Sequence, residues 1–307
     1  MEEFAIALFV YNRPIHTEKV LKSLIECNKS NNYDLIIFSD GAKNKESESE
    51  VLKVREICEK ANGFKSIKLI KREKNIGLAQ NIITGLNNAF SNYSQITVIE
   101  DDIKVSKGFL EYITAALEFY KNKNVLSISG YTPNIKIPQN YKNSTYIIKR
   151  NCSWGWATWK EKWEIIDWQV SDFKDFIRDK NKIKKFNECG DDLTPMLLKQ
   201  QIGQINSWSI RFCYSGFCNN LPTVYPTKSL VENIGTDGSG TNVRNTKKYR
   251  TFSVENIDLQ NFTDNIEQNS EILKTFRKTY NTSLFRKTIN LIKRIKYLLT
   301  NKTKKEL

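Results

Sequence analysis

The feature that most restricts the fold of this sequence is the regular alternation of strand-like and helix-like segments over residues 4–120. Short apolar runs predict strands at 4–11, 34–40, 66–70 and 95–102. The stretches between them predict helices up to about Cys27, up to about Asn62, over 77–90, and from a predicted N-cap at Ser106 to about Tyr120. This alternation is typical of the α/β class, with an open, mainly parallel sheet flanked by helices.

Three of the predicted strands end in polar or charged side chains. These are Asn12 and Arg13 after the first strand, Ser39 and Asp40 at the second, and Glu100, Asp101 and Asp102 at the fourth. Ligands of open α/β sheets bind outside the carboxyl ends of the strands. We therefore expect these side chains to meet at one site.

The acid triplet Glu100-Asp101-Asp102 is unexpected in a chain with a net charge of +14. A polar turn or a helix cap is the ordinary explanation, but Ser106 is already predicted to cap the next helix. Adjacent carboxylates repel one another unless a cation or several donors compensate. A hard divalent ion with oxygen ligands would do so and would also hold a substrate's phosphates. The triplet therefore favours a metal site for a phosphate-bearing ligand.

The segment KREKNIGLAQN supports this interpretation. It places Lys71, Arg72 and Lys74 just before a glycine-containing helix start, where cations and backbone N–H groups can receive a diphosphate. Arg13 offers a second phosphate contact, and Asp40 is placed to accept a hydrogen bond from a nucleobase. A base pocket, phosphate-binding cations and a metal carboxylate thus follow one another along the chain.

The end of the chain is strongly basic. Residues 283–307 carry eight Lys or Arg residues and one Glu, which accounts for half of the net charge. Within this segment apolar residues recur at helical spacing, namely Phe285, Ile289, Ile292, Ile295 and Leu299. An apolar stripe with a cationic rim favours a helix at about 283–301 on an anionic membrane surface. The alternative is a terminal helix packed on its own domain with a solvated basic face.

Several observations limit the compartment and the class. The start MEEF has acids where a signal peptide needs basic residues, and no apolar stretch approaches the roughly 20 residues of a membrane span. The six cysteines include no CxxC pair, so we expect reduced thiols and a cytoplasmic location. Nucleic acid is disfavoured as a partner because strand-end acids would repel a polyanion. A nucleotidyltransferase is disfavoured because FVYNRPIHTEK lacks a glycine-rich phosphate loop.

Beyond these patterns, the motifs FVYNRP, FSDGAK, KNIGLAQN and EDD resemble the nucleotide-sugar-binding half of GT-A fold glycosyltransferases. EDD resembles the Asp-x-Asp-type metal motif of N-acetylglucosaminyltransferase I-like enzymes. CSWGWATW, NSWSIRF and NIGTDGSGTN resemble bacterial sugar transferases of surface-polysaccharide and lipopolysaccharide assembly. The resemblance covers about residues 4–245. It implies a GT-A (Rossmann-like) domain at 1–248, followed by a C-terminal extension at 249–307 with the amphipathic helix.

The resemblance implies roles for the strand-end residues. Asp102 would bind the metal, Mn²⁺ or Mg²⁺, that bridges the donor's diphosphate. Asp101 would contact the ribose, and Glu100 would support that loop. Arg13 would hold the phosphate and Asp40 a uracil-like base.

Further residues are implied around this centre. Arg72 and Asn75 would lie near the nucleotide. The segment 235–242, with Asp237 near the sugar, would be a lid that orders on donor binding, or else a glycine-rich surface turn. Aromatic rings can stack on sugars, so Trp154, Trp156 and Trp208 are candidate sugar or acceptor contacts, although most tryptophans in such segments are core residues.

The catalytic base departs from the family's pattern. Inversion at the anomeric carbon needs a carboxylate to take the acceptor's proton, and in relatives it lies near the segment that reads NSW here. Asn206 and Ser207 cannot do this. Asp191 and Asp192 are the nearest alternatives, and Glu232 is another. The competing interpretation of Asp191 or Asp192 is a structural helix N-terminal residue. This departure leaves a non-catalytic nucleotide-sugar- or glycan-binding relative as an alternative.

Together these features predict a metal-dependent hexosyl- or N-acetylhexosaminyltransferase. It would move a sugar from a nucleotide-diphosphate donor, a UDP-sugar, to a glycan or lipid-linked acceptor in bacterial surface-polysaccharide or lipopolysaccharide synthesis. We expect it to be peripheral at the inner face of the cytoplasmic membrane.

Overall fold

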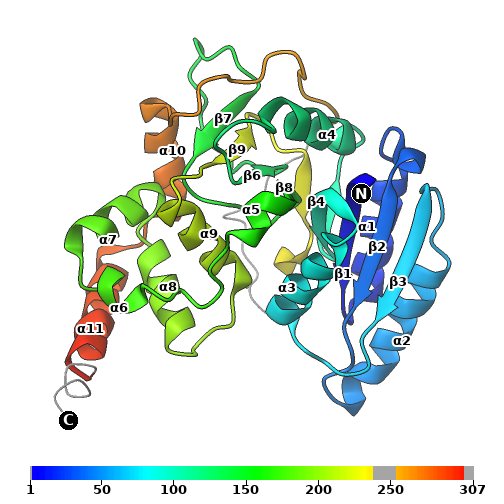
Figure 1. The fold of residues 1–307 in the computed structure, drawn as a ribbon, viewed down its shortest axis with the longest axis horizontal. Coiled ribbons are helices and arrows are strands. Elements are labelled where there is room, and N and C mark those ends of the chain that lie inside the picture. The colour runs from blue at the N-terminus through cyan, green and yellow to red at the C-terminus, as the bar shows by residue number, and fades with distance from the viewer. Residues whose placement is uncertain (1, 238–253, 301–307) are drawn as a thin grey trace.

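The structure, a computed structural model, describes residues 2–237 and 254–300. Within them, eight strands form one sheet in the order β3-β2-β1-β4-β8-β6-β9-β7 (Figure 1). They are β1 (Glu2–Val10), β2 (Asp34–Ser39), β3 (Ser66–Lys71), β4 (Tyr93–Glu100), β6 (Ser127–Ser129), β7 (Thr145–Ile148), β8 (Trp156–Trp159) and β9 (Thr223–Pro226). A separate antiparallel ribbon pairs β5 (Ile103–Val105) with β10 (Val231–Asn233).

The first four strands have the predicted parallel arrangement. β1 lies between β2 and β4 and is parallel to both, and β3 pairs in parallel with β2. The sheet becomes mixed beyond β4, because β8 runs antiparallel to β4 and β6, and β7 runs antiparallel to β9. The predicted α/β class is confirmed, and the four parallel strands bring their carboxyl ends to one edge.

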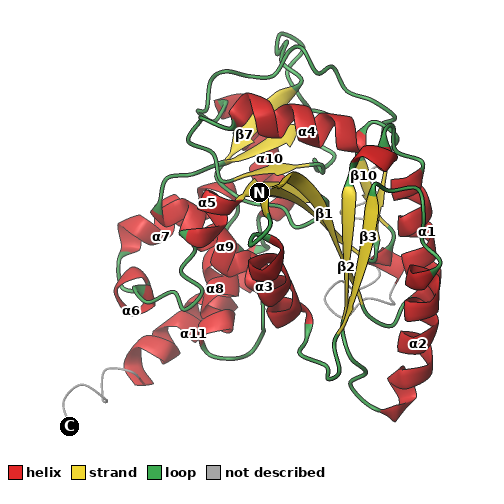
Figure 2. Ribbon diagram, turned by 45° about the vertical axis from the view of Figure 1, so that its right-hand side comes forward, coloured by secondary structure: helices red, strands yellow, loops and turns green. Residues whose placement is uncertain are grey.

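Helices cover both faces of the sheet. They are α1 (Pro14–Ile25), α2 (Lys45–Glu59), α3 (Leu78–Ala89), α4 (Phe109–Tyr120), α5 (Lys160–Glu164), α6 (Phe173–Phe176), α7 (Lys180–Phe186), α8 (Leu193–Gln201), α9 (Trp208–Cys218), α10 (Ser270–Tyr280) and α11 (Leu284–Thr300). Figure 2 shows α1 and α2 on one side of β2 and β3, with α3 on the other.

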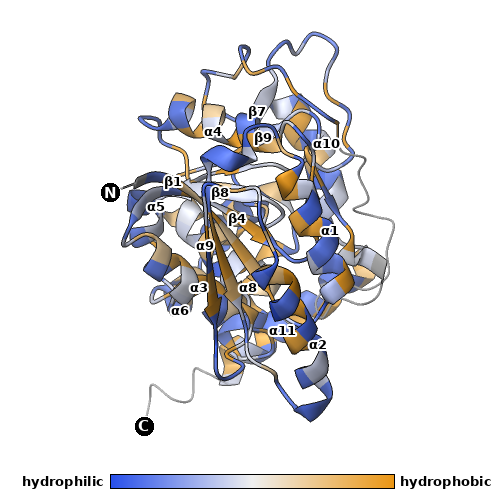
Figure 3. Cartoon of the chain, turned by 90° about the vertical axis from the view of Figure 1, so that its right-hand side faces the viewer, coloured by the Kyte–Doolittle hydropathy of each residue, from blue (hydrophilic) through white to orange (hydrophobic). Residues whose placement is uncertain are grey.

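Alternate side chains of β1 enter different clusters. Ile6, Leu8 and Val10 pack with residues of α1, α2 and α4. Ala5, Ala7 and Phe9 pack with residues of α3, α5 and α9. Because both faces of the central strands are buried, β1 is apolar without interruption from Phe4 to Val10. Figure 3 shows such hydrophobic strand segments, in orange, at the centre of the molecule.

The structure contradicts the prediction that Ser106 caps a helix. α4 begins at Phe109 with Gly108 at the N-cap, and no side chain caps it. Residues 103–105 instead form β5, and the backbone N–H of Ser106 donates to Leu230 O at 2.9 Å. Ser106 Oγ is buried without a hydrogen-bond partner in the described part of the chain. Pairing with the distant β10, which no local signal reveals, sets this boundary.

The segment after residue 253 packs on the sheet domain. Ile272 and Phe276 of α10 are buried against Tyr146 and Tyr225. The predicted C-terminal helix is confirmed as α11. The expected domain boundary at residue 248 lies outside the described residues and stays a prediction. No helix within residues 2–237 and 254–300 has the length and hydrophobicity needed to cross a bilayer.

Candidate donor-binding site at the strand ends

The acid triplet lies beside the end of β1. Phe9 is in register with Glu100, the last residue of β4, so the residues that follow β1 face the turn formed by Asp101 and Asp102. The backbone N–H of Tyr11 donates to Asp101 Oδ2 at 3.3 Å. Parallel pairing of β1 with β4 is therefore what brings Arg13 to the acids.

Arg13 bridges the two aspartates. Its Nη1 lies 3.1 Å from Asp102 Oδ2, and its Nη2 donates to Asp101 Oδ1. Burial alone would lower the pKa of Arg13, but Asp101 and Asp102 outweigh it and raise that pKa. The guanidinium therefore stays charged and compensates the carboxylates, which answers how a buried strand can end in three acids.

Burial shifts the pKa values of Glu100 and Asp101. Burial, followed by the charges of Asp102 and Asp101, raises the pKa of Glu100 well above its usual value. Burial also raises the pKa of Asp101, although Arg13 opposes the shift. Negative charge is thus costly here unless a cation is close.

Gly235 closes over this cluster from the other half of the chain. A Cβ at this position would lie 2.3 Å from Asp102 Oδ2 and 3.0 Å from Arg13 Nη1. The backbone N–H of Ile234 donates to Asp102 O at 2.9 Å. Only glycine permits this approach. Residues 235–242 are predicted to form a lid or a glycine-rich surface turn. Gly235–Asp237 form a 3₁₀ turn, whereas residues 238–242 and the side chain of Asp237 lie outside the described part, so the lid stays a prediction.

The carboxylates here would supply only part of the ligand set of a hard divalent cation. No group of three or more His, Cys, Asp or Glu side chains in the described residues could hold a metal by itself. Asp102 is 15% exposed at its side chain and would be one ligand among several. Mg²⁺ and similar ions are commonly held by one or two carboxylates together with substrate phosphates and water. The residues present fit that kind of site.

Asp40 organises the neighbouring loop. Its carboxylate accepts from Gly41 N at 2.9 Å and Ile76 N at 3.0 Å through Oδ1, and from Gly77 N at 2.9 Å and Asn75 Nδ2 at 3.0 Å through Oδ2. A carboxylate has about four acceptor positions. Those of Asp40 are already occupied, so the residue shapes the loop before α3, and its predicted contact with a base stays a prediction.

Replacing Asp40 with asparagine is expected to lower the free energy of unfolding by about 1–3 kcal/mol. The new NH₂ group would face N–H donors and leave them unsatisfied. We expect urea unfolding to show this loss, together with weaker nucleotide binding in a titration. Asp175→Asn, at an exposed position on α6, is the matched control. Unchanged stability would contradict the role of Asp40 in ordering the loop.

Two arginines fix the ends of β2 and β3. Arg72 donates to Asn81 Oδ1 at 3.2 Å and to Thr84 Oγ1 at 3.0 Å, both on α3. Arg55 of α2 donates to Ser39 Oγ at 3.2 Å and to Arg72 O at 2.7 Å. The sequence analysis did not single out Arg55. The one local feature that points to Arg55 is its position directly after Val54, which is on the buried face of α2.

The three predicted tryptophans lie in different environments. Trp156 and Trp208 are 1% and 3% exposed, and their rings stack on each other with centroids 5.0 Å apart. Rings buried in this way present no face to a sugar, so this part of the expectation does not fit the structure. Trp154 is partly exposed and lies edge-on to Tyr131 with centroids 4.7 Å apart. Trp154 remains the candidate for a sugar contact.

The candidate bases Asp191 and Asp192 make structural contacts. Asp192 binds Arg150 through two hydrogen bonds of 2.7 and 2.8 Å. Asp191 accepts from Thr282 N at 2.7 Å and pairs with Lys287 Nζ at 2.8 Å. Burial would raise the pKa of Asp191, but the hydrogen bonds from Lys287 and Thr282 prevail and lower it. A carboxylate held in this way is a weaker base.

The remaining base candidates differ in position. Asn206 is exposed and accepts from Arg211 at 3.3 Å. Glu232 lies on β10 opposite Lys104, on the strand that leads to Gly235 and Asp102. Its side chain is half-buried. Among the candidate bases Asp191, Asp192 and Glu232, Glu232 is the closest in sequence to Gly235, which covers the acid cluster.

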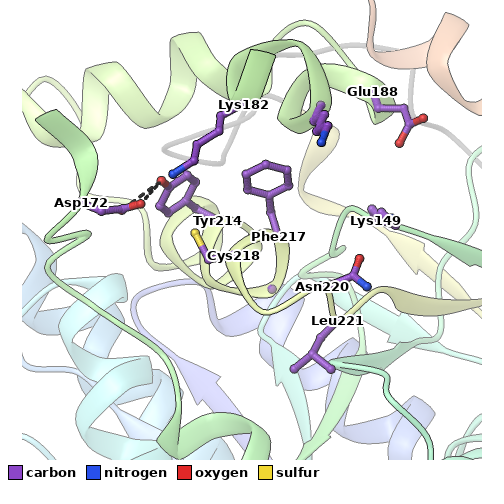
Figure 4. Close-up of a pocket in the computed structure, with 11 residues that line it drawn as sticks. Lys149, Asp172, Lys182, Glu188, Tyr214, Phe217, Cys218, Asn220 and Leu221 are labelled. Carbon is purple, nitrogen blue, oxygen red and sulfur yellow. Dashed lines mark hydrogen bonds between the residues drawn. The ribbon is translucent and has the colours of Figure 1, made fainter. Parts of the chain in front are cut away.

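A cavity of about 650 Å³ lies elsewhere in the molecule (Figure 4). Lys149 and Leu221, which line it, follow β7 and precede β9, at the sheet edge opposite the acid cluster. Figure 4 shows Tyr214, Cys218 and Lys182 grouped around Asp172, with hydrogen bonds from Tyr214 to Asp172. None of the residues predicted for the donor site lines this cavity.

The chain belongs to glycosyl transferase family 2, because the model of that family matches residues 5–181. This confirms the resemblance to GT-A fold glycosyltransferases, which transfer sugar from nucleotide-sugar donors. No curated protein matches the chain.

Solved structures resemble the chain only distantly. S. aureus TarS shares 12% identity at a TM-score of 0.43, over 76% of this chain and 37% of that one. The mannosyltransferase PcManGT from Pyrobaculum calidifontis, in complex with GDP-Man and Mn²⁺, shares 14% at a TM-score of 0.34, over 52% of this chain and 45% of that one. A UDP-glucose pyrophosphorylase complexed with UDP-glucose shares 13% at 0.38, over 76% and 94%. This chain thus spans less than half the length of the first two.

Proposed function

We propose that this family 2 glycosyltransferase is a metal-dependent enzyme that moves a sugar from a UDP-sugar to a glycan or lipid-linked acceptor. The observation that carries the proposal is the meeting of Arg13, Asp101 and Asp102 beside the loop ordered by Asp40, at one edge of the sheet. The pathway that fits the sequence motifs is bacterial surface-polysaccharide or lipopolysaccharide synthesis, with hexose or N-acetylhexosamine as the transferred sugar.

Each residue of the site would have a distinct role. Asp102 would hold Mn²⁺ or Mg²⁺, an ion that supplies stabilisation of the charge that develops on the departing nucleoside diphosphate. Arg13 keeps its charge and would face the diphosphate, while Asp101 would contact the ribose beside Glu100. Asp40 orders the loop around Asn75, and Arg72 fixes that loop to α3.

Inversion requires a base, and a carboxylate that is not already paired with a cation is the best candidate. Asp192 is neutralised by Arg150, and Asp191 by Lys287, so both would have to leave these partners. Glu232 is half-buried on the strand that leads to Gly235. We propose Glu232 as the first residue to test as the base. Its replacement by glutamine should then lower the transfer rate while donor binding persists.

Titration calorimetry with UDP, with and without Mn²⁺, tests the proposal. We expect UDP to bind the wild-type protein more tightly with Mn²⁺, and Asp102→Asn to lose that metal-dependent gain by about tenfold or more, since it removes a charged ligand. Asp175→Asn should behave as the wild type. Equal binding with and without metal, or preferential binding of GDP or CMP, would contradict the proposal.

A non-catalytic relative is the second candidate, because an exposed amide, Asn206, stands where relatives are expected to have a carboxylate. Metal-dependent UDP binding with no hydrolysis or transfer from any UDP-sugar would favour it.

We further propose that the enzyme works at the inner face of the cytoplasmic membrane, where lipid-linked acceptors are found. The support for this lies in the C-terminal helix.

A further inference from the structure

The C-terminal helix α11 is fixed to the body of the protein along one side. Tyr297 and Leu298 pack against the cluster formed by α6 to α9, and the rings of Tyr297 and Phe173 lie 5.6 Å apart. Arg294 Nε donates to Ile177 O at 3.1 Å. These contacts fix the C-terminal half of the helix.

The start of α11 is fixed by Asp191. This carboxylate binds Lys287 on the first turns of the helix and Thr282 just before it. The Asp191 side chain is 16% exposed and that of Lys287 is 47% exposed, so only the carboxylate of this pair is shielded from water. A residue named from the sequence as a candidate base thus anchors the helix. Both halves of α11 are therefore held against the domain.

The opposite side of α11 is apolar and exposed. Its large apolar residues are Leu284 (81% exposed), Phe285 (77%), Leu291 (53%), Ile292 (59%), Ile295 (47%) and Leu299 (62%). At 100° per residue they fall on one continuous side of the helix. The other exposed large apolar residues of the described chain are single residues spread over several elements. Isolated ones need no explanation, whereas a contiguous patch marks an interaction surface.

The charge of α11 points to the kind of partner. The helix carries Arg286, Lys287, Lys293, Arg294 and Lys296, and no acid. On the helical wheel, Lys296 borders the apolar side, and Lys293 lies farther round on the same flank. Two copies of the chain that joined these sides would bring like charges together. An anionic surface would instead receive both the apolar side chains and the cations.

We propose that α11 binds the surface of an anionic lipid bilayer, lying flat with this apolar side inserted. A helix of 17 residues is about 25 Å long, and it is too polar to span the membrane. The inference deepens the proposed function, since it names the surface from which a lipid-linked acceptor would come. Because the other side of α11 is fixed, the bilayer would orient the whole domain.

Vesicle co-sedimentation of the full chain tests this proposal. We expect binding to phosphatidylcholine vesicles that contain phosphatidylglycerol and much weaker binding to pure phosphatidylcholine. The variant Leu291→Ser/Ile292→Ser/Ile295→Ser should lose about tenfold or more of the binding constant, because three apolar insertions are removed. Leu52→Ser/Ile165→Ser/Leu259→Ser changes three exposed apolar residues that lie apart from one another and outside α11. It is the matched control and should bind like the wild type.

A charge variant separates the two contributions. Lys293→Gln/Lys296→Gln should weaken binding to the anionic vesicles by about fivefold for each cation, and added salt should remove this difference. Equal vesicle binding by the serine variant and the wild type would overturn the proposal. So would a dimer in light scattering that the serine variant dissociates, if no vesicle binding accompanies it.

The UDP titration keeps the two proposals apart. Metal-dependent UDP binding by the serine variant is expected to match the wild type, since α11 does not contact the acid cluster. A protein that binds UDP but no vesicles would overturn only the membrane inference. One that binds vesicles but no nucleotide would overturn only the proposed function.

Discussion

Replacing Asp192 with alanine is expected to lower the free energy of unfolding by about 3 kcal/mol or more, because it leaves Arg150 unpaired in a largely buried position. The Arg150 side chain is 11% exposed, and its other close partner is the ring of Tyr280, 3.8 Å from Cζ to the centroid. Urea unfolding followed by circular dichroism measures this loss.

The double variant Arg150→Met/Asp192→Leu is the informative control. Replacing both members of a buried pair with apolar residues costs far less than removing one of them. We therefore expect the double variant to recover most of the lost stability. If Asp192→Ala instead kept its stability and lost only transfer, Asp192 would return to the role of base and the structural interpretation would be wrong.

The second large effect is expected from Trp156→Ala, which should cost about 3–5 kcal/mol. Trp156 is stacked on Trp208 and lies 5.0 Å from the ring of Phe212. Its indole N–H has no hydrogen-bond partner in the described residues, so its contribution is packing. The same measurement on Trp154→Ala should show a clearly smaller loss, because that ring is only partly buried.

For sugar binding we expect the larger effect from Trp154→Ala and not from Trp156→Ala. Trp154→Ala is expected to weaken binding of the whole UDP-sugar relative to UDP alone, if its ring lies against the sugar. A stable Trp156→Ala protein with a specific loss of sugar binding would show that Trp156 reaches the site after all.

The sequence predicted the strand-end convergence well because it follows from local patterns. Short apolar runs identify the parallel strands, and their polar ends meet once the strands are parallel. The basic helix at the end of the chain was equally visible, since its apolar spacing is a property of one segment. These features need no knowledge of distant contacts.

The sequence could not predict what depends on distant partners. Arg150, Asp192 and Tyr280 come together from three separate segments, which no spacing rule relates. Trp156 lies on β8, whose four residues are all buried because helices cover both faces of the sheet there. A tryptophan in such a strand has the same local sequence whether it forms a core or a sugar wall.

The attachment of α11 has a mechanical consequence. Lys287 near one end and Tyr297 near the other attach the helix to the domain. The helix and the strand-end site would therefore keep a constant position relative to each other. A surface that holds α11 would hold the site at a constant height. The distance of the acceptor hydroxyl from the membrane would then select among acceptors. A hydroxyl too near the surface, or too far from it, would not enter the site even if its chemistry were suitable.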